Sequence, residues 1–307
     1  MTQPEWIEIA LFIHGITPGK HARSHDVAYG RLFGLIQDAL KESGKPPLDS
    51  LPIQVEWGWE SGQSAENDRF LAEAESVICE QVNAAEQSAH DPSVVPLLRP
   101  LHLRARQMLI SGLADLFYYV SKDGERVVRK HVFNYLCSQI NERKASHPAS
   151  KISLTLIAHS AGALIAHDLL YHLFRKTSRK SEGGSPVSQV RELARKGELR
   201  VRRFYSMGTP LTPLAVRADS LLVKIAKHQQ KADPECIGLK QSDGLSNPRW
   251  VNFWDMDDVA AFPVEFLYAN ENKVIEDKYV DLGDVFPAVH ARYWTSAQVA
   301  GYIAETF

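Results

Sequence analysis

Residues 151–168 read Lys-Ile-Ser-Leu-Thr-Leu-Ile-Ala-His-Ser-Ala-Gly-Ala-Leu-Ile-Ala-His-Asp, and this stretch decides the fold. The apolar, partly β-branched run from Ile152 to Ile157 predicts a buried strand, and a helical pattern begins at Ala161. Between them, a turn of small residues leaves Ser160 at its apex. This order of strand, sharp turn and helix is typical of a nucleophile elbow, in which a serine is held in a strained backbone conformation.

The interpretation as an elbow depends on the residues that surround the apex. Ala158 and Gly162 lie two positions before and after the serine, and both are small enough to let strand and helix pass close together. Glycine is the commoner residue at the first of these positions. A helix that begins at Ala161 would direct its backbone N–H groups toward negative charge forming beside Ser160. From these residues alone, an ordinary serine N-cap is the alternative.

The overall composition is that of a globular protein. The chain has 307 residues, of which 44% are hydrophobic and 23% charged, and this favours a single domain over residues 1–307. A formal net charge of −2 gives no indication of a nucleic-acid partner. The three cysteines form no ligand motif, so we expect no metal. Because the sequence shows neither a secretory leader nor a long apolar run, we expect a cytoplasmic protein.

Further periodic segments alternate between strand and helix patterns. This alternation predicts an α/β fold with a mostly parallel sheet of about six strands and helices on both faces. Besides the strand of the elbow, strands are expected over residues 6–13, 53–57, 201–206, 250–254 and 273–282. Helices are expected over residues 26–43, 161–174, 211–227 and near the C-terminus through Val299 and Ile303.

Two features are expected near the carboxyl ends of the strands, where open α/β sheets bind ligands. Trp57 and Trp59 follow the second strand and either line a pocket or serve as core and rim packing. Residues 60–147 are too long for one crossover, and their first two-thirds, residues 60–120, predict a helical insertion. This insertion is either a lid over the site or a helical layer packed on the sheet.

The chain resembles the α/β-hydrolase superfamily, in particular its lipases and serine esterases. The motifs that carry the resemblance are the His-Gly pair at residues 14–15, the elbow, the Gly-Thr-Pro turn at 208–210 and the His-Ala-Arg-Tyr-Trp sequence at 290–294. The resemblance covers nearly the whole chain outside the insertion and lacks two early strands of the family's sheet. It implies an oxyanion hole built from the N–H groups of Ile16 and Ala161, and a pocket bordered by His14, in a structural role, and by Thr209.

The order of motifs in this family is serine, acid and then histidine, and it implies a triad of Ser160, Asp258 and His290. Three aspartates compete for the acid position after the strand at 250–254. Asp258 fits the family pattern best, Asp255 is the runner-up and Asp257 fits least well.

The resemblance implies a serine carboxyl-ester hydrolase that acts on a small-molecule or lipid ester without a cofactor. The same triad would serve an acyltransferase or a thioesterase, and a non-catalytic binding protein with the hydrolase fold is a further alternative. His159 and His167 are expected to face away from the apex. Residues 175–203 hold ten Lys or Arg against three Glu, which predicts either a solvated connector or a surface for peripheral membrane contact. The oligomeric state stays open.

Overall fold

The computed structural model describes residues 5–15, 23–48, 53–55, 122–176, 184–214, 231–240 and 244–307, with isolated positions at 73, 76, 77 and 80. Ile16, Trp57, Trp59 and nearly all of the expected insertion at 60–120 lie outside the described residues, as does the second part of the helix expected at 211–227. The fold and the site are therefore built from the remaining elements.

The described strands form one six-stranded sheet in the order β2-β1-β3-β4-β5-β6, and every neighbouring pair is parallel. The strands are β1 (Trp6–Ile13), β2 (Ile53–Val55), β3 (Lys151–His159), β4 (Leu199–Met207), β5 (Trp250–Trp254) and β6 (Ile275–Tyr279). All residues of β3 after the first are buried, because strands of a parallel sheet are covered on both faces. The expected α/β class is confirmed.

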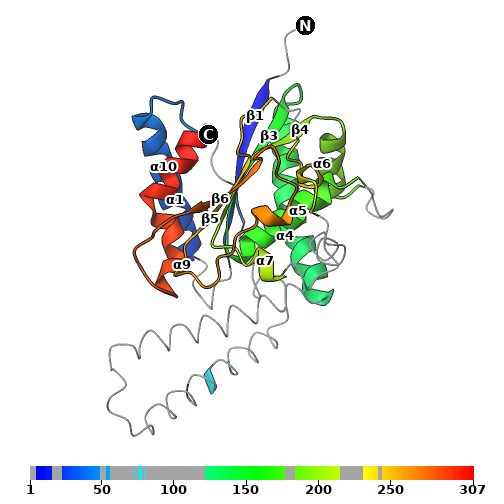
Figure 1. Ribbon diagram of the computed structural model, residues 1–307. Helices are drawn as coiled ribbons and strands as arrows, with labels where there is room; N and C mark the ends of the chain where they lie inside the picture. Colours follow the sequence, from blue (N-terminus) through cyan, green and yellow to red (C-terminus); the bar gives the residue numbers. More distant parts are fainter. Residues whose placement is uncertain are drawn as a thin grey trace, which may run out of the picture.

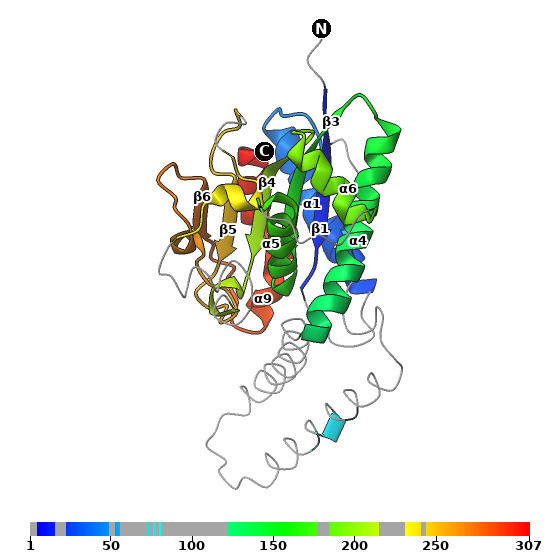
Figure 2. The same ribbon diagram turned by 90° about the vertical axis from the view of Figure 1, so that its right-hand side faces the viewer.

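Helices cover both faces of this sheet (Figure 1). Figure 2 shows the same arrangement turned by 90°. One face carries α1 (Arg23–Glu42) and α10 (Ala297–Thr306), and the other carries α4 (Lys122–Ser146), α5 (Ala161–Phe174) and α6 (Pro186–Arg195). Shorter helices are α7 (Leu211–Leu214), α9 (Ala288–Arg292), η2 (Pro234–Ile237), η4 (Glu265–Leu267) and η5 (Tyr293–Thr295). Within the described part of the chain, no helix has the length and apolar character needed to cross a membrane.

Two apolar cores lie on opposite sides of the sheet. Alternate residues of β1 divide between them, because successive side chains of a strand point to opposite faces. Leu11 and Ile13 belong to the core under α4, α5 and α6, whereas Phe12 belongs to the core under α1 and α10. Phe12 contacts Tyr29 of α1 edge-on at 5.7 Å between ring centroids and stacks on Trp294 of η5 at 6.5 Å. The second core therefore includes the segment that follows His290.

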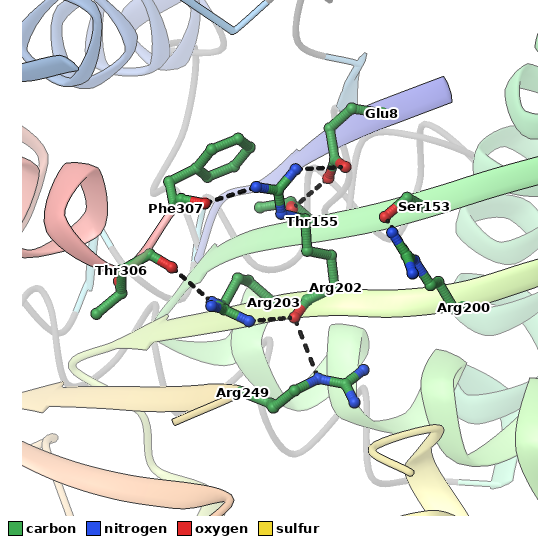
Figure 3. A network of polar contacts seen from close by, with 9 residues as sticks. All are labelled: Glu8, Ser153, Thr155, Arg200, Arg202, Arg203, Arg249, Thr306 and Phe307. Carbon is green, nitrogen blue, oxygen red and sulfur yellow. Dashed lines mark hydrogen bonds and ion pairs between the residues drawn. The ribbon is translucent and has the colours of Figure 1, made fainter. Parts of the chain in front are cut away.

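Part of the basic stretch at 175–203 is folded into a polar network near the amino ends of the strands (Figure 3). Arg202 donates to Glu8 at 3.2 Å and to the carbonyl of Phe307 at 2.5 Å. Arg203 is buried and donates to the carbonyl of Thr306 at 2.9 Å. These contacts hold the end of α10 against β4.

The network extends to the neighbouring strands, where Arg249 donates to the carbonyl of Arg202 and Arg200 donates to Ser153, each at 3.3 Å. Arg200, Arg202 and Arg203 thus belong to a network that neither interpretation of that stretch expected. Of the other basic residues between 175 and 203, Arg175, Arg191, Arg195 and Lys196 also make intramolecular contacts. Membrane contact through this stretch stays a prediction. The stretch also contains α6, a helix that the sequence analysis did not predict although Ser185 caps it and Pro186 is its first residue.

The first turn of α5 lies directly against the end of β1. A Cβ atom added to Gly162 would lie 2.2 Å from the carbonyl oxygen of His14 and 2.6 Å from that of Ile13. These distances are far below a van der Waals contact, so only glycine allows this approach. The small residue that an elbow requires after its serine is therefore needed for contact with β1.

Gly162→Ala is expected to lower the free energy of unfolding by about 1–3 kcal/mol or more, because the added methyl group meets backbone atoms that cannot rotate away. The matched control is Gly30→Ala in α1, where an added Cβ meets nothing within 4 Å. That change is expected to stabilise the protein by about 0.5–1 kcal/mol, since alanine favours the helix. Urea denaturation measures both, and equal effects of the two variants would contradict the argument.

Candidate active site

Ser160 occupies the turn between β3 and α5 in a strained backbone conformation. Its φ of 54° and ψ of −130° differ from the extended geometry of an N-cap, and its side chain makes no capping hydrogen bond. The ordinary N-cap alternative therefore does not describe this residue. A non-glycine residue at positive φ costs on the order of 1–3 kcal/mol. The backbone N–H of Ser160 donates to the carbonyl of Met207 at 2.9 Å, which ties the elbow to the end of β4.

The backbone after β1 passes directly over the Ser160 side chain. A Cβ atom added to Gly15 would lie 2.5 Å from Cβ and 3.1 Å from Oγ of Ser160. Ala161 is buried as the first residue of α5, where backbone N–H groups have no partner within the helix. The serine side chain thus lies between the amino end of a helix and a turn without side-chain bulk.

His290 and Asp258 form a buried pair. His290 lies in α9 and Asp258 in the turn after β5, with relative exposures of 5% and 2%. Nδ1 of His290 lies 3.0 Å from Oδ1 and 2.9 Å from Oδ2 of Asp258. Because an ionised carboxylate only accepts hydrogen bonds, Nδ1 carries the proton, and Nε2 of a neutral ring keeps its lone pair. The pair is thus arranged for His290 to accept a proton at Nε2.

The turn at Gly208 places this pair beside the elbow. Gly208 follows Met207, which accepts from Ser160, and has a φ of 57°, which favours glycine. A Cβ atom added here would lie 2.9 Å from Oδ2 of Asp258 and 3.3 Å from Cε1 of His290. The side chains at 160, 258 and 290 therefore gather around the carboxyl ends of β3, β4 and β5.

No hydrogen bond joins Ser160 Oγ to His290 among the contacts of the described residues. In serine hydrolases without substrate this contact is often long, and it tightens when substrate binds. The acid contact to Nδ1, in contrast, is already made.

The three aspartates of the loop after β5 have different surroundings. Asp258 faces His290, whereas Asp257 is exposed. Asp255 is buried, and its carboxylate accepts from the backbone N–H groups of Asp257 at 2.9 Å and of Leu282 at 2.8 Å. Asp255 therefore braces its own loop and joins it to the segment after β6.

Tyr293 connects this brace to the segment that carries His290. Its hydroxyl accepts from the backbone N–H of Asp255 at 3.1 Å. Burial raises the pKa of Tyr293, and the negative charge of Asp258 and hydrogen bonding to that carboxylate raise it further. The hydroxyl thus keeps its proton and faces both carboxylates of the loop. Trp294, the next residue, packs edge-on against Tyr29 of α1 at 5.2 Å between ring centroids.

His159 contacts the segment that carries His290, a contact that the sequence analysis did not predict. Its Nε2 donates to the backbone carbonyl of His290 at 2.6 Å, and the two ring centroids are 4.6 Å apart. The sequence analysis expected it to face away from the apex and foresaw no contact with the segment of His290. The signal was available, because His159 lies two residues after Ile157 in β3 and therefore points to the same face, toward the second core. His167, in contrast, lies in the middle of α5 and shares a hydrogen bond of 2.5 Å with the hydroxyl of Tyr268.

Of the expected pocket residues, the structure describes His14 and Thr209, and both are buried. His14 packs against Tyr29, with ring centroids 6.2 Å apart. Thr209 accepts at its carbonyl from the N–H of Phe262 at 3.1 Å, and its hydroxyl has no hydrogen-bond partner in the described part of the chain. The other half of the expected oxyanion hole, Ile16, lies outside the described residues.

Comparison with known proteins assigns the chain to no family, since no family model matches it and a search of curated proteins found no relative. Among the residues that the structure describes, no three His, Cys, Asp or Glu side chains are grouped as metal ligands. The protein therefore belongs to the class of parallel α/β proteins, and it carries a strained serine and a buried His–Asp pair at one edge of its sheet.

For the ester hydrolysis that the sequence resemblance implies, Asp258→Asn is expected to lower the rate on the order of 10⁴-fold, because an amide in this place favours the wrong tautomer of the imidazole. The matched control is Asp255→Asn, three residues away. It keeps the His290 contact but loses an acceptor for a backbone N–H, so its main effect should be a loss of about 1–3 kcal/mol in stability. Steady-state kinetics and thermal unfolding of both variants measure this difference. The reverse ranking of rates would assign the acid to Asp255.

Proposed function

We propose that this chain is a serine carboxyl-ester hydrolase with an α/β-hydrolase fold. The observation that carries the proposal is the strained serine at the apex of a strand–turn–helix element, beside a turn that also contacts a buried His–Asp pair. The three residues follow β3, β5 and β6 in the order Ser160, Asp258, His290, which is the order in that fold. Strain at a residue persists only where the surroundings enforce it, and it is concentrated at functional sites.

The proposed reaction is acyl transfer to the serine. Nε2 of His290 takes the hydroxyl proton as Ser160 Oγ attacks the ester carbonyl, and Asp258 stabilises the imidazolium that forms. The N–H groups of Ala161 and Ile16 would donate to the oxyanion, a contribution that can reach about 3–4 kcal/mol for one donor. The imidazolium then protonates the leaving alcohol. In the second half of the reaction, His290 removes a proton from water, which attacks the acyl-enzyme. The bond from the acyl carbon to Ser160 Oγ then breaks, the acid is released, and the imidazolium returns its proton to Oγ.

Exposed apolar side chains near Asp258 and His290 in the sequence agree with an ester that has an apolar acyl group. Met256 and Val259 flank Asp258 and are 68% and 63% exposed, and Val285, five residues before His290, is 49% exposed. The substrate class that fits these residues is a small-molecule or lipid ester. An acyltransferase or a thioesterase would use the same triad.

Ser160→Ala is expected to abolish hydrolysis of short p-nitrophenyl esters, with a loss in kcat of at least about 10⁴-fold. The fold should remain, since alanine removes only the hydroxyl. The control is Ser146→Ala at an exposed position in α4, which should leave the rate unchanged. Turnover at the wild-type rate by Ser160→Ala would overturn the proposal.

A fluorophosphonate probe tests the same assignment without a chosen substrate. Wild type and Ser146→Ala should become covalently labelled at Ser160, and Ser160→Ala should not. A binding protein with the hydrolase fold would give no label in any of the three proteins. Addition of an acceptor alcohol distinguishes a transferase, in which release of the acyl group becomes faster as the alcohol concentration rises.

A further inference from the structure

We propose that His159 is a positioning residue for the general base. It precedes the nucleophile Ser160 in the chain and fixes the position of His290 relative to that serine. This inference rests on the proposed function, because it assigns a task within the same site. The two histidines lie 131 residues apart in sequence. A hydrogen bond from the His159 side chain connects the strand that ends at the nucleophile to the element that carries the base.

The contact has the geometry of a strong hydrogen bond. Nε2 of His159 lies 2.6 Å from the carbonyl oxygen of His290, and both residues are buried. A carbonyl oxygen has no proton to donate, so Nε2 of His159 must carry one. The donor role is thus fixed by the partner. The contact is made to the backbone of His290, which leaves its ring nitrogens for Asp258 and for the serine.

The element held in this way is short. α9 has five residues and is followed at once by the three residues of η5. Helices of this length are not stable alone, so the position of His290 depends on tertiary contacts. The ring of His159 supplies several of them, with centroids 4.6 Å from His290, 5.9 Å from Tyr293 and 5.5 Å from Trp294.

The position of His159 follows from the elbow itself. It is the last residue of β3, and the rigid ladder with β4 reaches as far as this residue, which pairs with Met207. Any movement of α9 relative to this rigid strand changes the distance between the base and Ser160. Misplacement of a catalytic group by about 1 Å can cost on the order of 10²-fold in rate. His159 therefore acts on the chemical step rather than on substrate binding.

The test compares three substitutions of the same residue. His159→Gln places an amide NH₂ near the position of Nε2 and can still donate to the carbonyl. His159→Asn has the same polar group but is one methylene too short to reach. His159→Leu fills much of the space and donates nothing. The readouts are kcat and KM for a p-nitrophenyl ester, the rate of fluorophosphonate labelling of Ser160, and the melting temperature.

We expect His159→Asn and His159→Leu to lower kcat and the labelling rate by about 10- to 100-fold, with KM changed by less than about twofold. His159→Gln should recover most of the wild-type rate. If His159→Leu fails to fold, the comparison between His159→Gln and His159→Asn still tests the positioning role, because the two amides differ only in side-chain length. Equal rates for Gln and Asn, or loss in parallel with melting temperature, would overturn the positioning role.

The inference and the proposed function fail in different ways. If wild type and Ser160→Ala are labelled equally, the proposed function is wrong and His159 has no base to position. If labelling is specific to Ser160 but all three His159 variants react at the wild-type rate, the proposed function stands and the role of His159 is refuted.

Discussion

The site depends on the close approach of three backbone segments to one another. The end of β1, the elbow and the turn after β4 meet around Ser160, and a methyl group at Gly15 or Gly162 would lie within 2.2–2.6 Å of atoms in the facing segment. Protein interiors are packed too tightly to absorb such an overlap at no cost. The strained serine is held because the segments on either side leave it no room to relax. The parallel sheet is the frame that brings these segments to one edge.

Three polar contacts then join loops that the sheet alone does not fix. His159 holds the carbonyl of His290, Asp258 holds its Nδ1, and the hydroxyl of Tyr293 accepts from the N–H of Asp255. Each buried hydrogen bond contributes only about 1 kcal/mol net, but a partner left unsatisfied costs about 1–3 kcal/mol. Such a network therefore favours one arrangement of the three loops over others, and geometry is what the proposed chemistry needs.

The fold was predictable where its signals are local. The strand–turn–helix around Ser160 is specified by neighbouring residues, and the predicted bounds of β1 and β5 agree with the structure. α6 was missed because its capping signals at Ser185 and Pro186 lie within a run of basic and small residues that indicates a loop. The alternation of strand residues places His159 on the face of the second core, but sequence alone does not show that α9 packs there.

The choice between aspartates illustrates why the rest required coordinates. Asp255 and Asp258 follow the same strand, and both are buried, so neither spacing nor hydropathy separates them. The two aspartates differ in their hydrogen-bond partners, Leu282 for Asp255 and His290 for Asp258, and both partners lie more than 20 residues further along the chain. Asp255 accepts from two backbone N–H groups, whereas Asp258 accepts from the N–H of Ala260, the imidazole and the hydroxyl of Tyr293.

In the proposed reaction, this difference in partners would also give the two carboxylates different tasks. Backbone N–H groups stabilise Asp255 equally at every stage of a reaction, so its contribution belongs to the stability of the fold. The imidazole beside Asp258 is neutral until it takes a proton, and its attraction to the carboxylate then becomes an ion pair in a buried setting. An interaction that strengthens only as the proton moves lowers the barrier rather than the ground state. Two identical side chains three residues apart can thus serve stability and catalysis separately, according to which of them faces a group that changes charge.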